Sequence, residues 1–149
     1  MTTPEERLEA LGHHVPEVPK PVAAYVPAVR SGSYVYTSGQ LPMVDGSLVE
    51  AGKVGAEVSP ERAKELAAVC ALNALAAVRS VVGELSAVVR VVKVVGFVAS
   101  APDFTGQPGV VNGASELLGQ VFAEAGVHIV RSTEPLTAWP GPLSAALAR

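Results

Sequence analysis

A valine-rich run constrains the fold of this chain more than any other feature. "VVRVVKVVGFVAS" occupies Val88–Ser100. Its valine content and its length favour a strand over a helix, because β-branched side chains are stiff and pack well on a pleated surface. A nearly continuous apolar strand has both of its faces covered. We expect helices to cover one face and a second subunit to cover the other.

Two long helices flank this strand. Ser59–Gly83 begins with a good N-cap residue, carries proline at its first helical position, and has apolar residues at helical spacing up to the final glycine. Pro108–Ala125 shows a second apolar stripe and stops before Gly126. The pattern predicts an α+β domain in which two helices pack on one face of a mixed sheet.

The N-terminal part reads as a short helix followed by hairpins. Thr3–Leu11 is amphipathic, and a proline-rich connector follows it. Val22–Val29 and Tyr34–Thr37 are strand-like and are separated by the turn signal "RSGS". The Asp-Gly pair within Val44–Ser47 predicts a second hairpin.

Composition excludes several classes of protein. With 149 residues, 49% hydrophobic and 17% charged, the chain has the composition of one folded domain. A net charge of −3 without a lysine or arginine cluster argues against nucleic-acid and anionic-membrane partners. A single cysteine fits a reducing cytoplasm. The three histidines lack metal-ligand spacing, so we expect no metal site.

The segment "YVYTSGQLP" at Tyr34–Pro42 ends a strand on a hydroxyl, a glycine and an amide. A structural explanation is that Gly39 supplies a positive φ and that Pro42 stops the next ladder. A functional explanation is that Ser38 and the Gly39 N–H face a cleft and hold a carbonyl or carboxylate oxygen. The residues alone leave both explanations open.

Three further side chains are candidates for chemistry. Asn112 lies off the apolar stripe of the second long helix, as a surface amide or as a hydrogen-bonding group for a ligand. Arg131 is either a solvated charge or a bidentate clamp for a carboxylate. Cys70 lies on the apolar stripe of the first long helix, where a buried, inert thiol is expected.

Three segments in this order resemble the RidA/YjgF family: "AAYVPAVRSGSYVYTSGQLPM", "CALNALAAVRSVVGELSAVVRVVKVVGFVASAPDF" and "VVNGASELLGQVF". These are reactive-intermediate (imine and enamine) deaminases, once grouped with L-PSP endoribonucleases. The likeness runs from about Pro21 to Gly126. It implies a chorismate-mutase-like fold over residues 21–149, after an N-terminal helix and connector at residues 1–20. It also implies a homotrimer with clefts between subunits.

The resemblance also implies an activity and a set of site residues. Members hydrolyse 2-imino and 2-enamino acids such as 2-aminoacrylate to 2-keto acids and ammonia, without a cofactor. Tyr25 matches a tyrosine that lines the cleft, and Ser38 and Gly39 match a pair that touches the ligand. Asn112 matches the asparagine of the "VN" helix. Arg131 resembles the arginine that binds the substrate carboxylate and is the catalytic candidate.

The sequence departs from the family pattern from about residue 129. "TEPLTAWPGPLSAALAR" replaces a last strand patterned like "VEVEA", and its three prolines do not suit the same ladder. The glutamate of that strand, which positions water in the deaminases, has no counterpart. A trimer of the same fold that binds a small carboxylate without catalysis is therefore the alternative function. RNA cleavage or translation inhibition ranks third, because the chain lacks a basic stripe.

Overall fold

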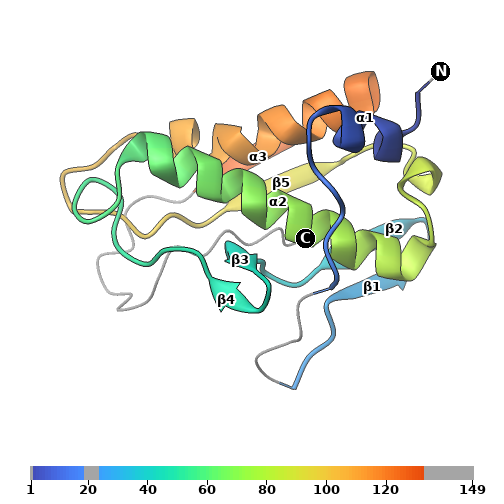
Figure 1. Cartoon of the computed structure of the whole chain (residues 1–149), viewed down its shortest axis with the longest axis horizontal. Coiled ribbons are helices and arrows are strands. Elements are labelled where there is room, and N and C mark those ends of the chain that lie inside the picture. Colours follow the sequence, from blue (N-terminus) through green and yellow to red (C-terminus); the bar gives the residue numbers. More distant parts are fainter. Residues whose placement is uncertain (1, 19–23, 133–149) are drawn as a thin grey trace.

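The structure is a computed structural model, and it describes residues 2–18 and 24–132. Two long helices, α2 (Pro60–Val82) and α3 (Gln107–Phe122), lie side by side over the strands (Figure 1). The short helix α1 (Pro4–Ala10) packs near one end of α3. The predicted arrangement of α+β type, with both long helices on the same side of the strands, is confirmed.

The helix boundaries follow from local capping. Thr3 and Glu6 form a reciprocal capping box at the start of α1, with bonds of 3.1 and 2.7 Å. The Ser59 hydroxyl accepts the Arg62 N–H at 3.1 Å and caps α2. Gly83 ends α2 with a φ of 89°, a conformation that glycine adopts without steric cost. The expected ends of these helices are therefore correct to within one residue.

The strands form three separate two-stranded ladders within the described residues. Two are antiparallel hairpins and one is a parallel pair: β1 (Ala28–Ser31) with β2 (Tyr34–Thr37), β3 (Met43–Val44) with β4 (Ser47–Leu48), and β5 (Lys93–Gly96) with β6 (Ile129–Ser132). Asp45 and Gly46, both at positive φ, make the predicted Asp-Gly turn between β3 and β4.

Two predicted strands are too long. β1 begins at Ala28 and not at Val22, because Pro27 has no N–H to give to a ladder. Residues 22 and 23 lie outside the described part of the chain. The strand expected over Val88–Ser100 occupies only β5, since its partner β6 is four residues long. Val89, outside this ladder, is 88% exposed in the single chain, and the expected cover by a second subunit stays a prediction.

The core lies between the two long helices and β5. It is built from small and medium aliphatic side chains, as the low aromatic content predicts, and Cys70 is buried in it at 3% exposure. By length and composition alone α2 could cross a membrane, but half of its most apolar window is buried inside the protein. The helices approach closely where Gly113 of α3 meets Lys64 of α2: an added Cβ would lie 1.8 Å from the Lys64 carbonyl oxygen.

Candidate functional site

The Ser38–Gly39 corner lies at the end of β2, against the segment that leads into β1. The Ser38 N–H donates to the Pro27 carbonyl at 2.8 Å, and the Ser38 hydroxyl donates to the Val26 carbonyl at 2.5 Å. Tyr25, 44% exposed, immediately precedes these acceptors. The structure thus brings the Tyr25 segment and the corner together, although Tyr25 stands before the first strand and not within it.

Gly39 has a role other than the one expected from conformation. Six glycines of the described residues have a positive φ, and Gly39 is not one of them. The structural explanation through a left-handed bend is therefore wrong. What glycine contributes here is the absence of a side chain at an exposed backbone position.

Two buried amides support the corner from below. Gln40 is 6% exposed, and its amide donates to the Ser38 carbonyl at 3.1 Å. Asn73 of α2 is 2% exposed, and its amide donates to the carbonyls of Leu41 and Met43, each at 3.0 Å. From the sequence, the Gln40 amide was noted only as part of the strand end, and Asn73 was not singled out. The available signal was a lone asparagine inside the apolar stretch "CALNALAA".

Arg131 lies on β6, on the face of the β5–β6 ladder that points away from the helices. Val94 belongs to the core, and an added Cβ at Gly96 would strike the Val111 side chain of α3 at 2.3 Å. Val94 and Gly96, which are alternate residues of β5, therefore face the helices. Val95 lies between Val94 and Gly96 in the strand and points to the opposite side. Arg131 pairs with Val95, so it points to that side as well. We call this side the helix-free face.

A histidine confirms this orientation from the other strand. The His128 Nε2 lies 3.0 Å from the Ser115 hydroxyl of α3, and its Nδ1 lies 2.5 Å from the Gly126 carbonyl. His128 therefore faces α3, and so does Val130, two residues further along. Ile129 and Arg131, which alternate with them, face away. Arg131 is exposed, and within the described ranges its side chain has no ion pair or hydrogen bond.

Asn112 lies in a different layer from Arg131. It is exposed on α3, as its position off the apolar stripe predicts, and its neighbour Val111 packs on Gly96. The β5–β6 ladder separates this helix from the face that carries Arg131. No hydrogen bond among the described residues joins Arg131 to Asn112 or to the Ser38–Gly39 corner. Within one chain, the five candidate residues do not form a single cluster.

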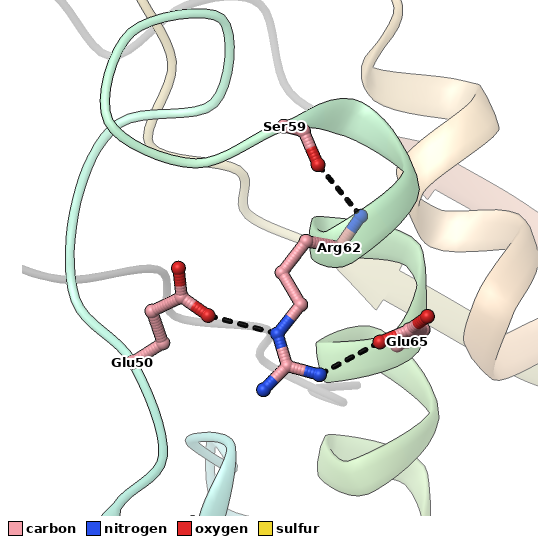
Figure 2. Close-up of polar contacts among 4 residues, drawn as sticks. All are labelled: Glu50, Ser59, Arg62 and Glu65. Atoms are coloured by element: carbon pink, nitrogen blue, oxygen red, sulfur yellow. Dashed lines mark hydrogen bonds and ion pairs between the residues drawn. The ribbon is translucent and has the colours of Figure 1, made fainter.

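Shifted acid–base groups occur elsewhere on the surface. Figure 2 shows Arg62, which donates to Glu50 at 2.8 Å and to Glu65 at 2.7 Å. These bonds, Glu50 first, raise the pKa of Arg62. The Lys53 N–H donates to Glu57 at 2.8 Å and is the largest cause of the lowered pKa of that carboxyl. Arg62 joins the start of α2 to the preceding loop, and Glu57 closes a turn of that loop. Neither group belongs to the corner or to β6.

No group of three or more His, Cys, Asp or Glu side chains in the described part of the chain could hold a metal ion. The chemistry available on the described candidates is therefore that of one guanidinium, hydroxyls, amides and backbone N–H groups. Such groups bind and orient an anion with a polar carbonyl or imine beside it.

Comparison with known proteins defines the class. The family model described as "YjgF/chorismate mutase-like, putative endoribonuclease" matches residues 5–140. The chain belongs to this family, and the predicted chorismate-mutase-like fold is confirmed.

Individual relatives agree with this assignment. Protein TCP17 of Trypanosoma cruzi is 39% identical over 117 residues, which are 78% of this chain and 73% of the relative. The crystal structure of Atu1372 from Agrobacterium tumefaciens, a protein of unknown function, is 38% identical with a TM-score of 0.85 over 98% of this chain and 91% of that one. The crystal structure of a "putative endoribonuclease" from Shewanella oneidensis MR-1 is 31% identical with a TM-score of 0.92. The match covers 97% of this chain and 96% of that one.

Proposed function

We propose that this protein is a RidA-like deaminase that hydrolyses 2-imino and 2-enamino acids to 2-keto acids and ammonia. The observation that carries the proposal is Arg131, an exposed guanidinium on the helix-free face with no acidic partner among the described residues. A guanidinium binds a carboxylate through two parallel N–H bonds and fixes its orientation.

The reaction needs little from the protein beyond orientation and proton transfer. A water molecule adds to the carbon of the C=N bond, the nitrogen gains protons, and the C–N bond breaks to release ammonia and leave the ketone. An enamine first becomes the imine by protonation at carbon. Holding substrate and water in reacting geometry removes most of the entropic cost of such a step.

The corner offers acceptors and a donor for the water and the imine. Because the Ser38 hydroxyl gives its proton to the Val26 carbonyl, its free lone pairs can only accept. Ser38 is thus suited to accept from the imine N–H or from the attacking water, and not to donate to the carboxylate. The Gly39 N–H, for which the described residues provide no acceptor, is suited to an oxygen.

The proposal includes a homotrimer whose sites lie between subunits. In one chain Arg131 lies on the β5–β6 ladder and the corner follows the β1–β2 ladder, and no described strand pairing joins these two ladders. We infer that a neighbouring copy brings them together. The exposed apolar side chains favour such a neighbour. Val29, Tyr34, Tyr36 and Ile129 are 42–65% exposed, and the two tyrosine rings lie 6.4 Å apart. Apolar surface of this kind marks interaction sites.

A trimer that binds a carboxylate without catalysis remains the second candidate. One observation favours it: the corner residues Tyr25, Ser38, Gly39 and Gln40 include no carboxyl or imidazole group that can shuttle a proton at neutral pH. The sequence also offers no counterpart of the family's final-strand glutamate, although the segment concerned, residues 133–149, lies outside the described part. RNA cleavage, suggested only by the names of relatives, is the third candidate.

The deciding experiment follows keto-acid release from 2-aminoacrylate made in place by a serine dehydratase. We expect the protein to accelerate this release. We expect Arg131→Gln to reduce the acceleration by about 10- to 100-fold, because that is the effect of losing one charge-assisted contact. Arg30→Gln, which removes an exposed strand arginine from β1, is the matched control.

The possible results separate the candidates. Acceleration that survives Arg131→Gln would remove the role given to Arg131. A folded oligomer that binds 2-keto acids in calorimetry but does not accelerate release would favour the binding trimer. Cleavage of RNA that depends on Arg131 would favour the third candidate.

A further inference from the structure

The helix-free face carries a second cation beside Arg131. Lys93 is the first residue of β5, and it has the same parity as Val95, so it points away from the helices. Lys93 pairs with Ile129, and Val95 pairs with Arg131. Lys93 and Arg131 are therefore diagonal neighbours on adjacent strands of one face. With a strand spacing of about 4.8 Å and a rise of about 3.3 Å per residue, their Cα atoms lie about 8 Å apart.

Neither cation has an acidic partner within the described ranges. Both residues are exposed, and neither takes part in an ion pair or a side-chain hydrogen bond. The other exposed cations among the described residues each donate to a backbone carbonyl, Arg30 to Gly32 at 3.1 Å and Arg90 to Val127 at 3.3 Å.

Charge is segregated between the two layers of the protein. The described strands contain no Asp or Glu, and their sequences are AVRS, YVYT, MV, SL, KVVG and IVRS. The chain as a whole is acidic, with a net charge of −3. The helix-free side of β5 and β6 is thus a local positive site on a negative protein. Such a site attracts anions more than the net charge predicts.

We propose that Lys93 and Arg131 together bind a substrate with two acid groups, a 2-imino acid that carries a second carboxylate on its side chain. This inference rests on the deaminase function proposed above for the reaction itself. Arg131 holds the carboxylate next to the imine, as before. Lys93 holds the second carboxylate, and Val95, which pairs with Arg131 on the same face, is itself buried at 8% exposure.

In the proposed trimer another subunit covers this face, and this cover makes an anionic ligand more important. Two unpaired cations that lose their water at an interface are costly, and an anion that contacts both removes much of this cost. A substrate with one carboxylate satisfies Arg131 and leaves Lys93 unpaired. A substrate with two satisfies both cations.

The test compares two stable keto acids of equal carbon number. 2-Oxoglutarate has a carboxylate where 2-oxopentanoate has a methyl group. Their dissociation constants are measured by calorimetry at fixed ionic strength on the full-length protein, and inorganic phosphate serves as a compact dianion that does not span the two cations. We expect 2-oxoglutarate to bind about tenfold more tightly than 2-oxopentanoate, as one added charge-assisted contact predicts.

Variants assign this preference to Lys93. Lys93→Gln should bring the ratio of the two constants to about one, while Lys93→Arg and the control Arg30→Gln should keep it. Equal binding of both keto acids by the wild type would overturn the inference, and so would a preference that survives Lys93→Gln. The deaminase proposal would remain in either case if Arg131→Gln weakened the binding of both ligands. Failure to bind either ligand would overturn the inference, and the deaminase proposal would then stand or fall on keto-acid release from 2-aminoacrylate.

Discussion

Asn73 is the buried link between α2 and the segment that forms the candidate corner. Its side chain is 2% exposed, and its amide donates to the carbonyls of Leu41 and Met43 at 3.0 Å each. Asn73→Ala removes both bonds and leaves a small cavity. At about 1 kcal/mol net for each bond plus the cavity, we expect a loss of about 2–3 kcal/mol in the free energy of unfolding. For a domain of this size that is a fall in Tm of about 4–12 °C.

The matched control is Asn112→Ala, the same deletion at an exposed helical position. We expect the control to change the free energy of unfolding by no more than about 0.5 kcal/mol. Urea unfolding of the two variants and the wild type measures the difference. If Asn73→Ala costs as little as the control, the two hydrogen bonds do not hold the corner and this reasoning is refuted.

Asn73→Asp sharpens the test through its pH dependence. The introduced carboxylate faces two carbonyl oxygens in a buried site, so its neutral form is favoured and its pKa in the folded protein is raised. A raised pKa means that the variant is most stable in acid and loses stability as the pH rises through that pKa. We expect its deficit relative to the wild type to grow from pH 5 to pH 8. A deficit that is constant with pH would show that the introduced group is not buried against these carbonyls.

Two other predictions concern helix packing and a surface loop. Gly113→Ala would place its Cβ 1.8 Å from the Lys64 carbonyl oxygen, so the helices must separate. We expect the free energy of unfolding, measured in urea, to fall by about 1–3 kcal/mol. A variant as stable as the wild type would contradict this close approach. The lowered pKa of Glu57, caused first by the Lys53 N–H, means that its carboxylate stabilises the fold at neutral pH and that this contribution is lost as the pH falls through the lowered pKa. Tm measured across the acid range should therefore show Glu57→Gln less stable than the wild type at neutral pH and equal to it in strong acid, and a difference that persists in strong acid would exclude this cause.

Elements fixed by local interactions could be predicted from the sequence. Thr3 and Ser59 cap their helices through bonds to backbone N–H groups three residues later, so the residue types are enough to place the helix starts. The turn at Asp45 and Gly46 follows from the same kind of local rule. The order of the elements also followed from residue patterns along the chain, and the family resemblance added the chorismate-mutase-like fold.

Features that depend on distant partners could not be predicted in this way. The valine run predicts a strand, but the length of β5 is set by the four residues of β6 that pair with it. Nothing near Asn73 in the sequence indicates that its amide reaches the carbonyls after β2. The direction of the Ser38 hydroxyl depends on the Val26 carbonyl, twelve residues earlier. The candidate site was therefore predicted as a list of residues, and its geometry needed the fold.

The C-terminal segment is the part of the sequence that departs most from the family pattern. The prediction that it departs from the family's last strand concerns residues 133–149, which lie outside the described part of the chain. An activity measurement on the full chain therefore tests whether this segment supports the proposed reaction.

The measurement that tests the account most directly is complementation between two variants. Arg131→Gln removes the carboxylate clamp, and Gly39→Val fills the corner at a position whose backbone does not require glycine. Each variant alone should accelerate keto-acid release from 2-aminoacrylate at least about tenfold less than the wild type does. In oligomers reassembled from equal amounts of both, about a quarter of the sites between neighbours combine an intact Arg131 with an intact corner. We predict that keto-acid release returns in these mixed oligomers, whereas mixtures as inactive as the separate variants would contradict a site shared between subunits.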